Sequence, residues 1–181
     1  MAEKTENRIS YVVKEWVIPI VTALLLAFLI NTFVVFRIEV PTGSMIPTIN
    51  VDDKIFVRKV YNKDQFERGD ILVFRSKELF TEDGKEMLLI KRLIGLPGDV
   101  VELKEGILYV NGYLVEEPYV VNQSSFTGTF TVPEDHLLFF GDNRKTSNDA
   151  RYWQQPYIHE DQVIGKGGLR ILPLENFGFL K

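Results

Sequence analysis

The sequence has no cysteine among its 181 residues. A chain without cysteine has no thiol nucleophile, no cysteine-ligated metal site and no disulfide framework. It has only two histidines, so few residues could form a histidine-based site. Its net charge is −4, from 21 basic and 25 acidic residues spread along the chain, which gives little support to nucleic-acid binding. We expect no metal, no cofactor and no nucleic-acid partner.

One long apolar segment, "VIPIVTALLLAFLINTFVVF", covers residues 17–36 and carries no charge. As a helix with a rise of about 1.5 Å per residue it would be roughly 30 Å long, which matches the hydrocarbon core of a bilayer. The apolar part of a cleaved secretory signal is usually shorter, about 7–15 residues. We therefore predict an uncleaved transmembrane helix, in preference to a signal sequence or a buried helix of a soluble core.

The charges around this segment predict its orientation. Three basic residues precede it, whereas only Arg37 and Lys54 follow it closely. Because cytoplasmic flanks carry the excess of Lys and Arg, the N-terminus is expected inside the cell. The predicted organisation is a short cytoplasmic tail (1–16), a single-pass anchor in the cell membrane (17–36) and an extracytoplasmic β-rich domain (37–181).

Everything after the anchor has the pattern of β-structure. Short runs rich in branched and aromatic residues alternate with Gly, Pro, Asn and Asp, and no sustained helical periodicity follows residue 38. Asn111-Gly112, between two apolar runs, is the preferred pair for a type I′ hairpin turn. Residues 76–87 are interpreted as a polar loop between strands. The predicted fold class is mainly β: an antiparallel β-sheet domain with one N-terminal transmembrane helix.

A serine in the stretch "VPTGSMIPTI" (40–49) is a candidate nucleophile, or part of an ordinary turn. To react, the Ser44 hydroxyl would need a base. The two histidines are weak candidates, because His136 opens an apolar strand and His159 lies in a polar segment. Neither belongs to a recognisable serine-hydrolase motif such as Gly-x-Ser-x-Gly.

Lysine is the other possible base. An unperturbed lysine has a pKa of about 10.4, so only about one molecule in 2,500 is neutral at pH 7, and a basic lysine must be desolvated. Lys91 interrupts the apolar run "MLLIKRLIGL", and strand alternation puts it on one face with Leu89 and Leu93. Two interpretations remain open: a desolvated base, or an edge-strand lysine whose amine reaches water.

The polar run "GDNRKTSNDAR" covers residues 141–151. Its oxygens could form a metal site, but the mid-loop glycine and distal glutamate of a calcium loop are missing. A self-satisfied loop, with its carboxylates paired to Arg144 or Arg151, is the alternative interpretation.

Four stretches, in this order after the anchor, resemble bacterial type I signal peptidases, the membrane-bound serine proteases that remove signal peptides from exported proteins. They are "SMIPT" (44–48), "RGDILVF" (68–74), "KRLIGLPGD" (91–99) and "GDNRKTSNDAR" (141–151). Each motif alone is weak, but together they are specific, and the resemblance covers nearly the whole chain.

The resemblance implies a catalytic dyad without histidine, in which Ser44 is the nucleophile and Lys91 the general base. The hydroxyl of Thr42 and the backbone N–H of Ser44 would form the oxyanion hole, which stabilises the charge that develops on the scissile carbonyl. Ser147 would hydrogen-bond the lysine amine and orient it.

The same resemblance implies support from the polar loop, where Asp149 and Arg151 would pair and Asp142 would help to hold the loop. Ala150 departs from the family, which commonly has a second small hydroxyl residue there. The long lobe of larger members is also missing, so residues 102–131 could form only a reduced second lobe. A shallow pocket for small side chains would be walled by Val40, Met45, Leu89 and Ile90.

The expected partners are signal-peptide-bearing precursors and membrane lipid. Ser44 follows Phe36 by eight residues, which span at most about 27 Å, so the serine would work near the bilayer surface. Two other functions agree less well with the sequence. A Ser/Lys self-cleaving protease of the repressor type is disfavoured by the anchor, because those proteins are soluble. A non-catalytic membrane-anchored binding domain is disfavoured by the intact Ser44 and Lys91.

Overall fold

The computed structural model describes residues 8, 10–62, 65–80, 84 and 86–180. The chain divides into two compact units, Met1–Phe36 and Arg37–Lys181.

The first unit contains an apolar helix that runs from Ser10 to Val34 and is long and apolar enough to cross a membrane. It comprises η1 (Val13–Val17), α2 (Ile18–Leu29) and η2 (Ile30–Val34). Pro19 lies in the first turn of α2, a position where a proline is tolerated. The helix begins seven residues before the apolar run. It ends two residues before the end of that run, because Val35 and Phe36 adopt the extended backbone that branched and aromatic residues favour.

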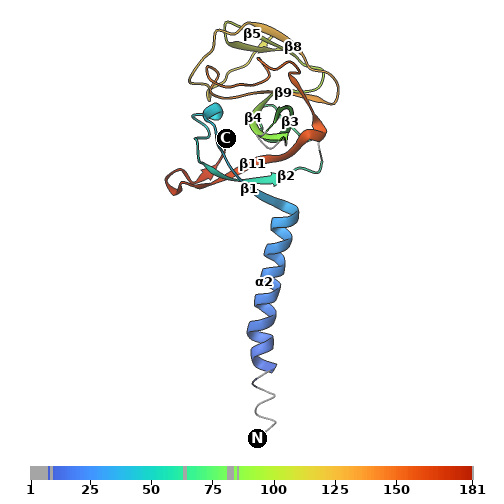
Figure 1. The fold of residues 1–181 in the computed structure, drawn as a ribbon, viewed down its shortest axis with the longest axis vertical. Coiled ribbons are helices and arrows are strands. Elements are labelled where there is room, and N and C mark those ends of the chain that lie inside the picture. The colour runs from blue at the N-terminus through green and yellow to red at the C-terminus, as the bar shows by residue number, and fades with distance from the viewer. Residues whose placement is uncertain (1–7, 9, 63–64, 81–83, 85, 181) are drawn as a thin grey trace. The chain divides into compact units, whose positions relative to one another are not determined.

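The larger sheet of the second unit has the strand order β1-β2-β11-β3-β4-β9-β10, with β12 paired to β11. Figure 1 shows β2, β11, β3, β4 and β9 following one another through the domain. Every pairing with a described register is antiparallel. The strands are β1 (Val35–Glu39), β2 (Lys54–Lys59), β3 (Ile71–Phe80), β4 (Glu86–Gly95), β9 (His136–Phe140), β10 (Tyr157–His159), β11 (Val163–Leu172) and β12 (Gly178–Phe179).

A second, smaller sheet has the order β7-β6-β5-β8. Its strands are β5 (Val100–Lys104), β6 (Ile107–Val110), β7 (Tyr113–Leu114) and β8 (Gly128–Thr131). Asn111 and Gly112 join β6 to β7 with φ angles of 52° and 82°, the positive pair that a type I′ turn requires. The predicted hairpin is confirmed. So is the fold class: antiparallel β-sheets preceded by one apolar N-terminal helix.

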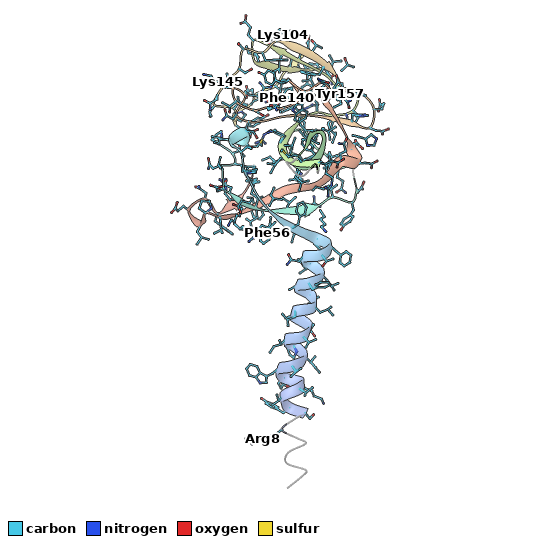
Figure 2. All side chains as sticks on the ribbon, in the orientation of Figure 1. Arg8, Phe56, Lys104, Phe140, Lys145 and Tyr157 are labelled. Atoms are coloured by element: carbon cyan, nitrogen blue, oxygen red, sulfur yellow. The ribbon has the colours of Figure 1, made fainter. Side chains whose placement is uncertain are left out.

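Strand β9 is buried on both faces, because it lies between two apolar clusters. Leu138 and Phe140 pack into the cluster shared with the smaller sheet. Leu137 and Phe139 point the other way, into a cluster with side chains of β3, β4 and β11. The polar loop that follows Phe140 therefore starts from a strand that is held from both sides. Figure 2 labels Phe140, which is buried, and Lys145, which is exposed on that loop.

The prediction of a polar loop over residues 76–87 is wrong at both ends. Strand β3 continues to Phe80 and β4 begins at Glu86, with Ser76 paired to Met87. Polar side chains are compatible with strands here, because this end of β4 is not covered and its residues alternate between exposed and half-buried. The centre of the expected loop, 81–83 and 85, lies outside the described residues.

Candidate active site

The candidate nucleophile lies in a tight turn. Residues Gly43–Met45 form one 3-10 turn, η3, closed by a hydrogen bond of 3.3 Å from the Ile46 N–H to the Gly43 carbonyl. Thr42 precedes it with extended backbone. The turn gives neighbouring side chains different surroundings: Ser44 lines a groove and is 9% exposed, whereas Met45 is fully buried.

Lys91 lies on β4, opposite Leu72 of β3, and its residue is 3% exposed. Its Nζ hydrogen-bonds to Oγ of Ser44. Oγ1 of Thr42 lies 3.3 Å from the same serine oxygen. The structure therefore brings the predicted nucleophile, base and oxyanion-hole hydroxyl to one point, although they come from two separate segments of the chain.

Burial lowers the pKa of Lys91 from 10.5 to about 8. The negative charges of Asp149 and Asp142 act in the opposite direction but are outweighed, and the positive charge of Arg151 adds to the lowering. Of the two interpretations of Lys91 left open by the sequence, the structure has the buried, desolvated amine.

The first support behind the dyad is a buried ion pair between β4 and the polar loop. Nε and Nη2 of Arg92 donate to the two carboxylate oxygens of Asp142, at 2.8 and 2.6 Å. Oγ1 of Thr48 also donates to Asp142, at 2.5 Å. Because Thr48 follows the nucleophile turn, this one carboxylate connects the turn to the strand that carries Lys91.

A second ion pair lies within the loop. Arg151 donates through Nε and Nη2 to Asp149, at 2.8 and 2.9 Å. Asp149 also accepts from the N–H of Gly141 at 2.9 Å, which fixes the start of the loop. Arg144 pairs with Glu117, a buried carboxylate from outside the loop that sequence reasoning missed. Both acids of the loop are thus paired with arginine, and no metal-ligand cluster is found among the residues described.

The loop packs directly against the nucleophile turn. A Cβ on Gly141 would lie 2.4 Å from the Ser44 carbonyl oxygen and 2.2 Å from Oγ of Ser147, so only glycine permits this approach. Asn143 donates its backbone N–H to the Ser44 carbonyl and its Nδ2 to the Gly43 carbonyl, both at 3.1 Å. Sequence reasoning missed Asn143; its place inside the "GDNR" motif was the only signal.

Ser147 does not make the expected contact with the lysine amine. Its side chain faces the start of its own loop at Gly141, and among the described residues its buried Oγ has no hydrogen-bond partner. The amine of Lys91 is directed to Ser44 instead. The predicted hydrogen bond from Ser147 to Lys91 is therefore absent from this structure.

A groove of about 700 Å³ runs along the dyad. One wall is the end of β1 and the residues after it, and the other is the first half of β4. Strand β9 pairs with β4 only at Arg92, Leu93 and Gly95, so the preceding half of β4 lies beyond that pairing. The lining residues are Ile38, Glu39, Val40, Pro41, Thr42, Ser44, Val73, Arg75, Glu86, Met87, Leu88, Leu89, Ile90 and Lys91.

Three of the four predicted wall residues, Val40, Leu89 and Ile90, line this groove. The fourth prediction is wrong: Met45 is not among the lining residues and is fully buried. The 3-10 turn is the physical reason, because it rotates the residue after Ser44 away from the groove and into the interior.

Both histidines lie outside the groove lining. His136 and His159 are register partners on β9 and β10, with ring centroids 5.1 Å apart. His159 accepts a hydrogen bond of 3.2 Å from the N–H of Asp161 and caps a short 3-10 turn. Their described contacts are structural.

Comparison with known proteins gives four findings. The sequence pattern of the family described as "Signal peptidase, peptidase S26" matches residues 13–172. A "Probable signal peptidase I-2" of Synechocystis is 36% identical over 162 residues, which cover 88% of this chain and 73% of that protein. A "Signal peptidase IB" of Staphylococcus aureus is 34% identical over 183 residues, which cover 90% and 91%. A crystal structure of a signal peptidase I from Enterococcus faecalis, at 32% identity, covers 56% of this chain and 96% of that one, with a TM-score of 0.46.

Proposed function

The chain belongs to the signal peptidase family, peptidase S26, the serine endopeptidases that remove signal peptides, and we propose that Ser44 is its nucleophile and Lys91 its general base. One observation carries this assignment: the desolvated amine of Lys91 hydrogen-bonds the Ser44 hydroxyl at the wall of the groove. The pairing matches a nucleophile with a base in hydrogen-bond reach, which is the geometry that covalent catalysis requires.

The reaction begins when neutral Lys91 accepts the Ser44 proton as Oγ attacks the scissile carbonyl. The carbonyl oxygen becomes an oxyanion, which the Ser44 N–H and the Thr42 hydroxyl stabilise. The protonated lysine then gives its proton to the leaving amine, and the acyl-enzyme forms. In the second half a water attacks the acyl carbon, Lys91 takes the water's proton, and that proton returns to Ser44.

The lowered pKa makes this base usable near neutral pH. With a pKa of about 8, about one lysine in ten is neutral at pH 7, against about one in 2,500 at the reference value. Burial therefore raises the reactive fraction roughly 250-fold.

The groove suggests how the precursor binds. An extended segment that ends at the scissile bond fits between the chain after β1 and the first half of β4, where strand-like backbone pairing is available. Val40, Leu89 and Ile90 leave room for small side chains next to the dyad. Alanine is expected before the cut and another small residue two positions earlier, because an unpaired charge against this wall is costly.

An apolar N-terminal helix and signal peptidase relatives indicate a membrane-anchored protein. The finer placement is our proposal: a cytoplasmic tail at 1–16, the anchor of the cell membrane at 17–36, and the catalytic domain at 37–181 on the outer face. The smaller sheet would be the reduced second lobe. The short spacing from Phe36 to Ser44 supports cleavage close to the bilayer and its lipids.

The test is to incubate the purified full-length protein with a precursor and to sequence the new N-terminus. We expect one cut, after alanine, that the Ser44→Ala variant does not make. Labelling of Ser44 by a serine-reactive probe separates the enzyme from a binding domain, and an unchanged mass of the protein itself argues against self-cleavage. Equal cutting after lysine or phenylalanine would contradict the pocket assignment.

A further inference from the structure

A second asparagine, Asn122, hydrogen-bonds to the side chain of Asn143. Asn143 is 7% exposed and donates from its side-chain nitrogen to the Gly43 carbonyl, at 3.1 Å. Its side-chain oxygen in turn accepts a hydrogen bond of 3.2 Å from Nδ2 of Asn122, which lies between β7 and β8. The backbone N–H of Lys145 donates to the Asn122 carbonyl at 3.1 Å, which ties this segment to the polar loop. Two amides thus form a chain of hydrogen bonds that ends on the nucleophile turn.

The carbonyl that Asn143 holds belongs to the peptide unit that joins Gly43 to Ser44. In a trans peptide the C=O of one residue and the N–H of the next lie in one plane and point in opposite directions. A donor that fixes the Gly43 C=O therefore fixes the direction of the Ser44 N–H on the other side of the plane. That N–H is one of the two donors assigned to the oxyanion hole.

The Gly43 carbonyl, which can only accept, decides which way the Asn143 amide is turned, and the donor from Asn122 is complementary to that orientation. A side-chain amide offers an acceptor oxygen on one side and a donor nitrogen on the other. If the Asn143 amide were reversed, its oxygen would face the Gly43 oxygen and its nitrogen would face the Asn122 nitrogen. The contact with Gly43 would then be unfavourable and the present hydrogen bond from Asn122 would be lost, so the donor from Asn122 stabilises the orientation in which Asn143 holds the peptide.

We propose that Asn143 is a positioning residue for the oxyanion hole and that Asn122 stabilises its orientation; the inference rests on the function proposed above. Neither side chain touches the reacting atoms. Removing an oxyanion-hole donor outright costs about 10²–10³ in kcat. Misdirecting one should cost less, so we expect about a tenfold loss for Asn143→Leu and a smaller loss for Asn122→Ala.

The test compares two inhibitors built on one peptide that ends in alanine. In the aldehyde, Ser44 Oγ bonds to the carbonyl carbon, the serine proton passes to Lys91, and the former carbonyl oxygen becomes an oxyanion in the hole. The matched peptide alcohol binds the groove but has no carbonyl to add to. The variants are Asn143→Leu and Asn122→Ala, with Asn176→Ala, an exposed asparagine remote in sequence from the site, as control.

In both variants kcat should fall with KM nearly unchanged. Affinity for the aldehyde should fall by a similar factor, and affinity for the alcohol should stay the same. The rising limb of the pH profile should not move, because the substitutions change no charge. Asn176→Ala should leave every value unchanged.

Equal weakening of aldehyde and alcohol binding would overturn the proposal, since it would mean damage to the groove itself. Should Asn143→Leu fail to fold, the Asn122→Ala variant provides the test. Because Asn122 is exposed, its replacement is expected to leave the protein folded. An unchanged ratio of aldehyde to alcohol affinity in folded Asn122→Ala overturns the proposal equally. Failure of the proposed function is a separate result: precursor cleavage that persists in Ser44→Ala.

Discussion

Two neighbouring buried basic residues on opposite faces of β4 have very different partners. Lys91 and Arg92 are neighbours, and each is 3% exposed. Arg92 has both oxygens of Asp142, the carbonyl of Gly69 at 2.8 Å and the ring of Tyr119 stacked 3.8 Å from its guanidinium carbon. Lys91 has the Ser44 hydroxyl and, within the described part of the chain, no ion pair.

The difference shows that equal burial can serve two purposes. A guanidinium cannot lose its proton in a protein, so a buried arginine needs a carboxylate partner. An ammonium can lose its proton, and the one on Lys91 has no ion pair with a carboxylate among the described residues, so burial favours the neutral amine. Pairing on one face keeps a charge and builds structure. On the other face, Lys91 has no ion pair among the described residues, and this favours the neutral amine that can act as a base.

The largest effect should follow from removing either member of the dyad. Ser44→Ala and Lys91→Ala should each lower kcat by at least about 10³-fold in a folded protein, because the two groups act as one unit. Lys91→Arg should not restore activity, since arginine stays protonated. Precursor cleavage measures this, and His136→Ala and His159→Ala serve as controls that should stay active. Loss of chemistry in a folded histidine variant would refute the Ser/Lys assignment.

Next in size is the loss of the pair on the opposite face. Asp142→Asn should lower the free energy of unfolding by about 3–5 kcal/mol, because the Arg92 charge is left buried without its partner. Chemical denaturation measures it. The control is Glu102→Gln, which breaks an exposed pair with Lys104 at 3.4 Å and should cost less than about 1 kcal/mol. Equal losses in both variants would mean that the buried pair has no special weight.

Replacing Lys91 with an apolar residue should instead increase the free energy of unfolding. The pKa of Lys91 is about 8 in the folded protein, below its ordinary 10.5. Below pH 8 both states are protonated and the folded state bears the full cost of the buried charge; as pH rises from 8 to 10.5 the folded state releases its proton first and the cost fades. Lys91→Met should therefore stabilise the protein by about 2–3 kcal/mol at pH 7.

Denaturation of wild type and Lys91→Met at pH 7 and near pH 10.5 measures this difference. The gain should shrink or vanish at the higher pH. If Lys91→Met were less stable than the wild type at pH 7, burial of the Lys91 ammonium would not be costly in this protein.

The smallest effect concerns the wall beside the amine. Activity should rise with pH through about 8, the pKa of Lys91. Leu89→Asn admits water and polar groups, so the pKa of Lys91 should increase toward its ordinary value. The rising limb of the pH–activity profile should therefore move to higher pH, by less than about one pH unit. Leu88→Asn, in the same strand but on the other face, should affect KM more than the limb. A limb that stays in place in folded Leu89→Asn would show that this wall does not set the pKa.

Local patterns predicted much of this molecule. The Asn111-Gly112 turn, the β-character of the domain and the apolar surroundings of Lys91 all follow from residues within a few positions of one another. The dyad needed the four motifs together, because no local rule connects Ser44 to a residue 47 positions later.

What the sequence did not predict depends on contacts across long separations or on local rotation. Asn143 bonds to Gly43 across 100 positions, and Glu117 bonds to Arg144 from a segment that no motif marks. Met45 was misplaced because its position next to Ser44 gave no information about the 3-10 turn, which directs the Met45 side chain into the interior. The residues after Ser76 were polar enough to look like a loop, while cross-strand pairing to Met87 keeps them in β3.

The burial of β9 on both faces has a consequence for how activity disappears. Regions of a protein that open by local unfolding have few buried contacts, and β9 has the opposite character. The polar loop of residues 141–151 begins directly after Phe140, the last residue of this strand. The backbone amides of β9 should therefore exchange with solvent as slowly as the slowest-exchanging amides of the domain. No local fluctuation short of global unfolding should release the polar loop. On heating, cleavage activity and the near-ultraviolet signal of the packed aromatic rings should be lost in one transition.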